Sequence, residues 1–278
     1  MNTKQVLAAS AVFLSSAVSA AEVCLLANNG FLIKGKNKSV VLDAMIEKPM
    51  YGYPALSSET YALFIHGKAP FDSLDVALTT HKHRDHFQAE VLLEHAKNSQ
   101  TVYVLPPQAK AEIDTIAPDH DLADRLLTDV PIHNSKAIER QVNGVDITIY
   151  SINHGAREPA EGAKQTETNH SAYKVEIDGI SFTHLGDAKT TTEFLSMAGV
   201  TKAKTDYLLV PYWSVRNPEY VHALKEAWDF DHLILMHMDQ IDRENPKQLT
   251  WFNKTILSLK ETFPEAWIPL KEMECRKT

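Results

Sequence analysis

The amino-acid sequence predicts a mixed α/β fold, in which β-strands come first and then alternate with helices. Short runs of β-branched and apolar residues recur along the chain, with turn clusters between the early runs and helical patterns between the later ones. The composition is that of an ordinary globular protein, with 44% hydrophobic and 23% charged residues among 278. Because no repeat, low-complexity tract or Pro/Ser-rich linker divides the sequence after residue 21, we expect one domain over residues 21–278.

The first twenty residues have the pattern of a secretory signal peptide. Lys4 is the only charge in a short polar start, and the apolar stretch Val6–Val18 contains no acidic residue. Val18-Ser19-Ala20 then places small side chains where a signal peptidase cleaves. A buried N-terminal helix is the alternative. We predict that residues 1–20 are removed near Ala20 and that the mature protein is periplasmic or secreted, without membrane anchoring.

Ten segments have the length and the Val, Ile, Leu and Tyr content of β-strands. Turn clusters at Asn28-Asn29-Gly30 and at residues 35–38 make the first three an antiparallel meander. The predicted strands are Val23–Leu26, Phe31–Lys34, Ser39–Leu42, Leu74–Leu78, Thr101–Leu105, Val145–Ile152, Tyr173–Ile177, Ile180–His184, Tyr207–Pro211 and His232–Met236.

Three helices are predicted among the strands. Phe87–Ala96 has helical periodicity. Asn217-Pro218 and Asn245-Pro246 each place a capping Asn before a Pro at the first helical position, which predicts helices over Pro218–Trp228 and Pro246–Phe263.

Two cysteines, Cys24 and Cys275, lie near opposite ends of the predicted mature chain. In an oxidising compartment a disulfide between them would close nearly the whole molecule into one loop. Two separate buried thiols are an equal alternative, because the sequence carries no geometry.

Histidine and aspartate side chains stand where several predicted strands end. Five strands each deliver such a residue at or just beyond the carboxyl end. Ligands of α/β sheets bind at this edge, so we expect the side chains to converge in one crevice. The residues are Asp43, the run His81-Lys82-His83-Arg84-Asp85-His86, His154, Asp187 and His237.

The run from His81 to His86 indicates a metal site. Neutral imidazole and carboxylate are ligands of Zn²⁺ and similar ions, three or four to each ion. His81 and His83 are two residues apart, so on a tight loop they can hold one ion from the same side, while Asp85 and His86 face a second. With 13 His in 278 residues, such a run arises by chance in roughly one chain in several hundred. A solvated polar loop is the alternative.

The segment Thr80-His81-Lys82-His83-Arg84-Asp85-His86-Phe87 resembles the signature loop of the metallo-β-lactamase superfamily. The other strand-end residues fall in the order of that superfamily's remaining motifs, and the resemblance runs from about residue 23 to 260. It implies an αββα four-layer sandwich of two β-sheets flanked by helices, with metals at one edge. Phe182–Asp187 and Leu235–His237 look most like the broad branch of small bacterial metal-dependent hydrolases.

The resemblance implies a place for each ligand. One ion would have three histidines, the other two histidines and an aspartate, and one more aspartate would bridge both ions together with a water or hydroxide. The first set is His81, His83 and His154, the second is Asp85, His86 and His237, and the bridge is Asp187. Asp85 would also orient the hydroxide, which makes Asp85 and Asp187 the catalytic pair.

Three further residues are expected around these ligands. Asp43 would accept a hydrogen bond from the signature loop and orient it, and His184 is a candidate for a similar supporting role. His154 and His170 both precede the Asp187 strand; we favour His154 as the ligand because it stands at a strand end. His170 is then a possible proton donor or the alternative ligand.

These observations predict an exported dinuclear metal-dependent hydrolase that acts on an ester, lactone or phosphodiester bond of a small molecule. Two divalent ions are expected, with Zn²⁺ favoured over Mn²⁺ or Fe²⁺. A β-lactam hydrolase is one alternative, weakened because Asp187 stands where zinc enzymes of the antibiotic-resistance type usually have Cys. A non-catalytic or redox metal-binding protein of the same fold is another. The net charge of −8 and the pI of about 5.9 argue against a nucleic-acid partner. Neither the substrate nor the oligomeric state follows from the sequence.

Overall fold

The computed structural model describes residues 21–132, 135–155, 168–239, 241–242 and 244–278. The predicted signal peptide, residues 1–20, lies outside the described residues. Within the described ranges, no helix has both the length and the apolar character needed to cross a membrane.

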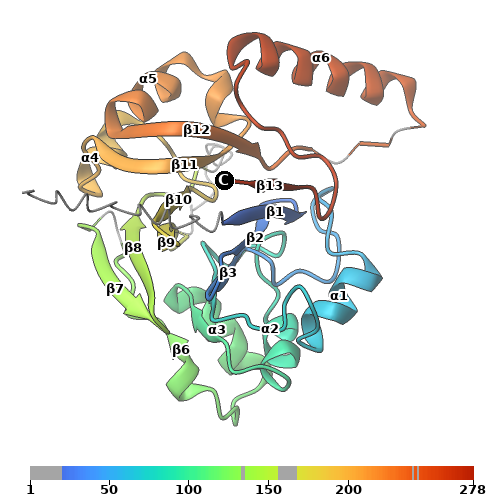
Figure 1. The fold of residues 1–278 in the computed structure, drawn as a ribbon, viewed down its shortest axis with the longest axis vertical. Helices are drawn as coiled ribbons and strands as arrows, with labels where there is room; N and C mark the ends of the chain where they lie inside the picture. Colours follow the sequence, from blue (N-terminus) through green and yellow to red (C-terminus); the bar gives the residue numbers. More distant parts are fainter. Residues whose placement is uncertain (1–20, 133–134, 156–167, 240, 243) are drawn as a thin grey trace, which may run out of the picture.

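Two mixed β-sheets form the centre of the molecule (Figure 1). In the first sheet the N-terminal strands form the predicted antiparallel meander, and the later strands continue it in parallel. Its strand order is β13 (Cys275–Lys277), β1 (Glu22–Ala27), β2 (Gly30–Lys34), β3 (Ser39–Leu42), β4 (Val76–Leu78), β5 (Val102–Val104) and β6 (Leu126–Leu127).

The second sheet combines a parallel half with an antiparallel half. Strands β10, β11 and β12 run parallel, and β7, β8 and β9 are antiparallel to their neighbours. Its order is β12 (Trp228–Met236), β11 (Ala203–Pro211), β10 (Ile180–His184), β9 (Ser171–Ile177), β8 (Val145–Ser151) and β7 (Ile138–Val142). Because β8 and β10 are both antiparallel to β9, they end at the same edge of the sheet.

Side chains point to opposite faces of a sheet in alternation, so each sheet has apolar residues on both faces. The result is three apolar layers: one between the two sheets and one between each sheet and its helices. In β1, Val23 and Leu25 face the second sheet, whereas Leu26 faces the helices on the other side. The second sheet likewise packs its outer face against helices. Each large side chain removed from water in these layers contributes about 1.5–3 kcal/mol. The result is the αββα sandwich that the resemblance implied.

Six helices in the described residues flank the sheets. Asn217 and Asn245 cap α5 and α6 as predicted, with side-chain oxygens that accept backbone N–H groups at 3.0 Å and 3.1 Å. The first three helices lie on the first sheet and α4 and α5 on the second, whereas α6 projects past the edge of the sheets and reaches the outer apolar layer through Leu259 (Figure 1). They are α1 (Ser58–Ile65), α2 (Ala89–Ala96), α3 (Pro107–Ile116), α4 (Thr192–Met197), α5 (Pro218–Ala227) and α6 (Pro246–Thr262).

Several predicted boundaries were wrong by one to four residues. The helix predicted from Phe87 begins at Ala89, because Phe87 is buried and the Gln88 side chain binds the backbone of residues 47–48. The helix predicted to reach Trp228 ends one residue earlier, since Trp228 already pairs with Ala203 in the sheet. That pairing also extends β11 and β12 toward their N-termini. The helices α1, α3 and α4 and the strands β6, β7 and β13 were not predicted.

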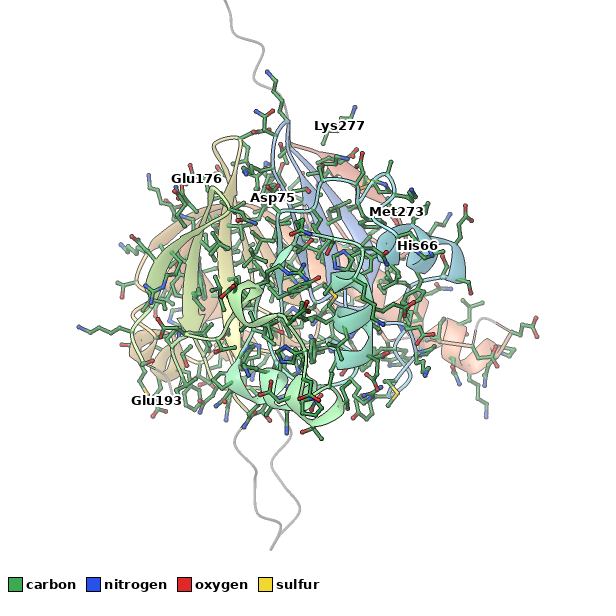
Figure 2. All side chains as sticks on the ribbon, turned by 90° about the horizontal axis from the view of Figure 1, so that it is seen from below. His66, Asp75, Glu176, Glu193, Met273 and Lys277 are labelled. Carbon is green, nitrogen blue, oxygen red and sulfur yellow. A yellow bond between two sulfur atoms is a disulfide. The ribbon has the colours of Figure 1, made fainter. Side chains whose placement is uncertain are left out.

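A disulfide joins Cys24 to Cys275, which decides between the two alternatives left open by the sequence. The two residues are direct partners in the antiparallel pairing of β1 with β13. The disulfide therefore fastens the end of the chain to the first sheet. Figure 2 shows side chains filling the space between the ribbons, with exposed charged residues such as Glu193 and Lys277 at the periphery.

Candidate metal centre

Asp43 and the loop after β4 form the floor of the site. Asp43 accepts hydrogen bonds from the backbone N–H and from the hydroxyl of Thr80, both at 2.7 Å. It also accepts a hydrogen bond from Nδ1 of His86 at 2.8 Å, and all three residues are fully buried. The backbone N–H groups of His86 and Phe87 both donate to the carbonyl of His83 at 2.9 Å. The loop thus turns tightly and brings its histidine rings together.

The Asp43 carboxylate also fixes which ring nitrogen is free in two of these histidines. The hydroxyl of Thr80 donates its hydrogen to Asp43, so it must accept from Nδ1 of His81, which lies 3.0 Å away. His86 donates its Nδ1 hydrogen to the same carboxylate, since an ionised carboxylate only accepts. In the neutral form of both rings, Nε2 then carries the lone pair, the form in which imidazole binds metal ions.

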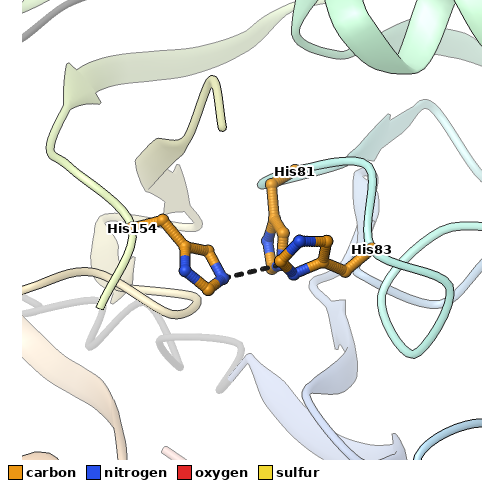
Figure 3. A group of neighbouring side chains, drawn as sticks. All are labelled: His81, His83 and His154. Carbon is orange, nitrogen blue, oxygen red and sulfur yellow. Dashed lines mark hydrogen bonds between the residues drawn. The ribbon is translucent and has the colours of Figure 1, made fainter. Parts of the chain in front are cut away.

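Three histidines form a first cluster of ligand atoms. Nε2 of His81 lies 3.0 Å from Nδ1 of His83 and 3.2 Å from Nε2 of His154. Figure 3 shows the three rings turned toward one another, with His154 arriving from the loop after β8. Three nitrogens bound to one tetrahedral ion would lie about 3.3 Å apart. The spacing of the three rings fits a shared ion.

A second cluster surrounds the other side of Asp187. Asp85, His86 and His237 offer ligand atoms within 4.8 Å of one another, as do His81, His86 and Asp187. Oδ1 of Asp187 lies 3.4 Å from Nε2 of His86 and 3.3 Å from Nε2 of His237. Oδ2 of Asp187 lies 3.4 Å from Nε2 of His154. The two oxygens of one carboxylate therefore face different clusters.

Buried polar atoms without partners support a metal at this place. Among the described residues, both ring nitrogens of His237 are buried and make no hydrogen bond. An unpaired buried nitrogen costs free energy unless something binds it. Nε2 of His237 faces Asp85 and Asp187 at 3.5 Å and 3.3 Å, a pair of oxygens suited to the same ion. The residues present fit divalent metal ions.

His81, His83 and Asp187 have the protonation states that metal binding requires, whereas His86 does not. Burial, aided by neighbouring histidines, lowers the pKa of His81 well below its ordinary value and that of His83 to about 4. Burial would raise the pKa of Asp187, but His237 and His86 outweigh it and hold that pKa well below its usual range. Burial would lower the pKa of His86, but Asp187 and Asp43 outweigh it and hold that pKa well above its ordinary value. A metal ion must therefore displace a proton from His86.

His170 and His184 lie next to the ligands but bind the backbone. The ring of His170 has Nδ1 3.0 Å from the carbonyl of Ile152, and its Nε2 accepts the N–H of Asp187 at 3.0 Å. Nε2 of His184 donates to the carbonyl of Asn29 at 2.8 Å, and its Nδ1 accepts from Gly186 at 3.1 Å. Both rings use both nitrogens, so they support the site from outside.

Gly186 is required by this close packing. It has a φ of +52°, and a side-chain Cβ there would lie 2.7 Å from Nε2 of His170 and 2.8 Å from Cβ of Thr80. Only glycine lets the backbone before Asp187 approach both the signature loop and His170.

The site opens into a cavity of about 570 Å³. Sequence reasoning missed Asp239, which accepts hydrogen bonds from the hydroxyls of Tyr212 and Tyr53 at 2.8 Å and 3.4 Å. It also missed Asn28 and Asn29, which the sequence presented only as a turn and which contact Asp85 and Asp187. The cavity is lined by Tyr51, Tyr53, His83, Asp85, His154, Gly155, Asp187, Tyr212, Trp213, His237 and Asp239.

Residues 22–230 match the family described as the beta-lactamase superfamily domain. The chain belongs to the metallo-β-lactamase superfamily. This membership confirms the predicted superfamily and the predicted fold. No curated protein sequence matches the chain.

Solved structures share the superfamily fold at low sequence identity. Igni18, a metallo hydrolase from the hyperthermophilic archaeon Ignicoccus hospitalis KIN4/I, is 13% identical with a TM-score of 0.57, over 94% of this chain and 99% of that one. An isothiocyanate hydrolase from Delia radicum gut bacteria gives the same identity and TM-score over 92% and 100%. CmlA, a diiron β-hydroxylase from Streptomyces venezuelae, is 10% identical with a TM-score of 0.54, over 94% of this chain and 54% of that one. At these identities the likeness concerns the fold.

Proposed function

We propose that the protein is a dinuclear metal-dependent hydrolase of a small molecule, acting on an ester, lactone or phosphodiester bond. The position of Asp187 carries this proposal. One of its oxygens faces His86 and His237, and the other faces His154. A single carboxylate shared between two clusters is the arrangement that holds two ions side by side.

The ligands divide into two sets with Asp187 between them. His81, His83 and His154 would hold the first ion, and Asp85, His86 and His237 the second. Zn²⁺ is the ion we favour, because nitrogen ligands dominate and the three-histidine cluster has tetrahedral spacing. Ions bound here supply a hydroxide nucleophile at neutral pH and polarise the oxygen of the bond to be cleaved.

The protein's own groups hold this chemistry in place. Asp43 orients His86 directly and His81 through Thr80. Tyr53 packs edge-on against the ring of His237 with centroids 4.3 Å apart, which limits the movement of that ligand. His170, which the sequence suggested as a possible proton donor, is engaged with the backbone, as is His184. Tyr212, in the cavity wall, is the candidate proton donor that we favour.

The cavity wall suits a small substrate with a flat or apolar part. Tyr51, Tyr53, Tyr212 and Trp213 contribute aromatic surface to this wall. A volume of about 570 Å³ is in the range of pockets for small molecules.

We also propose that the protein is exported. Two observations support this: the signal-peptide pattern of residues 1–20 and the disulfide between Cys24 and Cys275, a bond that persists in oxidising compartments. Protein from the native host should begin at or near Ala21 by mass spectrometry. Retention of Met1 on protein from the native host would contradict this proposal.

The activity is tested with mature protein loaded with Zn²⁺, Mn²⁺ or Fe²⁺. The substrate panel contains aryl esters, lactones and phosphodiesters, together with a β-lactam and an isothiocyanate for the alternative hydrolases. We expect hydrolysis of at least one of the first three classes, loss of activity after chelation, and loss in Asp187→Ala. Oxidation of a substrate by the iron-loaded protein with oxygen, without any hydrolysis, would favour the redox alternative. Full activity of Asp187→Ala would remove the dinuclear mechanism.

A further inference from the structure

The turn between β1 and β2 is buried although it is polar. Asn28 and Asn29 are 5% and 0% exposed. Turns between strands usually lie in water, where their polar side chains are solvated. Two buried amides in a two-residue turn therefore need partners, and the partners identify what the turn does.

Each amide donates to a different acidic residue of the metal centre. Nδ2 of Asn28 lies 3.1 Å from the carbonyl and 3.3 Å from Oδ2 of Asp85. Nδ2 of Asn29 lies 3.1 Å from Oδ1 of Asp187. Because ionised carboxylates only accept, the nitrogen and not the oxygen of each amide must face them. The orientation of both amides follows from this requirement.

The oxygen atoms of the same two amides have no hydrogen-bond donor. Oδ1 of Asn28 and Oδ1 of Asn29 are buried and have no hydrogen-bond partner among the described residues. Such atoms destabilise the folded protein, so these amides are a poor solution for stability alone. Their geometry makes sense as a means of holding the two carboxylates.

The turn itself is held rigidly against the site. Nε2 of His184 donates to the carbonyl of Asn29 at 2.8 Å. Asn28 has a φ of +45°, a conformation that asparagine tolerates well. A Cβ on Gly30 would lie 2.9 Å from the carbonyl oxygen of Ala27 and 3.0 Å from that of Asp43. The backbone of the turn thus lies directly on the residue that orients the signature loop.

We propose that Asn28 and Asn29 are positioning residues for the metal centre, each acting through one carboxylate ligand. The proposal rests on the proposed function. Asp85 and Asp187 both place an oxygen within 3.6 Å of Nε2 of His86. An amide donor orients each carboxylate without adding a positive charge that would repel the incoming ion.

The two residues should act on different parts of the site. Among the described residues of the metal centre, the Asn28 amide donates to Asp85, a proposed ligand of the second ion. The Asn29 amide lies 3.5 Å from the ring nitrogens of His86 and donates to Asp187, whose oxygens face both clusters. Loss of the Asn29 amide should therefore weaken both ions, and loss of the Asn28 amide should weaken one.

The test measures metal affinity, independently of any substrate. Asn28→Gly, Asn29→Ala and wild type are titrated with Zn²⁺ against a chromophoric chelator, and with Co²⁺ to record the absorption of each bound equivalent. Glycine at position 28 suits the positive φ. The matched control is Asn143→Gly, because Asn143 has a φ of +48° in the turn between β7 and β8, away from the metal centre.

We expect Asn29→Ala to weaken both equivalents and Asn28→Gly to weaken one, by about 10- to 100-fold, the usual scale for partners of metal ligands. Asn143→Gly should bind like wild type. Wild-type affinity in either folded variant, or an equal loss in the control, would overturn the assignment.

If Asn29→Ala fails to fold, Asn28→Gly still decides whether one equivalent is lost selectively. A wild-type protein that binds no metal would refute the proposed function and this inference together, whereas normal wild-type binding with unchanged variants refutes only the inference.

Discussion

His86 donates its Nδ1 hydrogen to Asp43 across 2.8 Å, and both side chains are fully buried. Asp43 stands at the end of β3, 43 positions before His86, so the contact joins two strand ends of the first sheet. It leaves Nε2 of His86 facing Asp85 and Asp187. The carboxylate of Asp43, which is not itself a proposed ligand, thus determines the orientation of the His86 ring, which is one.

Asp43→Asn should weaken binding of the ion held by His86 by about 10- to 100-fold, because the amide cannot replace the charge that holds the Nδ1 hydrogen. Competition with a chromophoric chelator measures the affinity. Asp75→Asn is the matched control, since Asp75 also accepts a backbone N–H, that of Ser39, in the same sheet. Equal affinities in wild type and Asp43→Asn would show that the hydrogen bond does not present the ligand.

His154→Ala and His170→Ala should separate a ligand from a supporting residue. His154→Ala is expected to lose first-site metal, because Nε2 of His154 is one of the three converging nitrogens. His170→Ala should keep its metal content but lose about 1–3 kcal/mol of unfolding free energy, since it leaves the Asp187 N–H and the Ile152 carbonyl unpaired. Elemental analysis and urea denaturation give the two readouts. Metal lost in His170→Ala and kept in His154→Ala would reverse the assignment.

Acidification should destabilise the protein partly through His95, which lies outside the metal centre. His95 is buried, stacks on Phe64, and has Nδ1 2.7 Å from the hydroxyl of Tyr103. Burial, with a smaller effect of Arg125, lowers its pKa to about 4. As the pH falls, His95 therefore becomes protonated near pH 6.5 in the unfolded chain but only near pH 4 in the folded protein. The stability contributed by neutral His95 is present above about pH 6.5 and is lost toward pH 4, by up to about 3 kcal/mol.

Denaturation of metal-free wild type and His95→Phe at pH 7 and pH 4.5 checks this effect. The variant keeps the stack on Phe64 and removes the titrating group, so it should lose less stability on acidification. Because the metal-centre histidines are the same in both proteins, their contribution cancels in the comparison. Identical losses in the two proteins would exclude His95 as a source of acid sensitivity.

Removal of the disulfide should lower the unfolding free energy by about 2–5 kcal/mol, because the bond closes a loop of 251 residues and so restricts the unfolded chain. The double variant Cys24→Ser, Cys275→Ser is compared with wild type by urea denaturation. Maleimide labelling of denatured, unreduced wild type should find no free thiol. Two labelled thiols per chain would contradict the disulfide.

Much of the candidate site was predictable because its signals are local. His81, His83, Asp85 and His86 lie within six residues, and the other proposed ligands follow apolar runs that form strands. The Asn-Pro pairs that begin α5 and α6 are equally local. Helices α1 and α3 escaped prediction because they bury few apolar residues; α3 buries only Ala109 and Ile113.

The sequence by itself determined the α/β class, the superfamily and the residue types that gather at the strand ends, since these depend on periodicity and on short motifs. Only the tertiary structure decided what each polar side chain contacts. Asn28 meets Asp85 across 57 positions and Asn29 meets Asp187 across 158. The ring of His170 uses both nitrogens for backbone groups, and this distinguishes it from His154. Cys24 lies opposite Cys275 because β1 pairs with β13. Such contacts arise when distant strands pack at one edge, and no pattern of neighbouring residues encodes them.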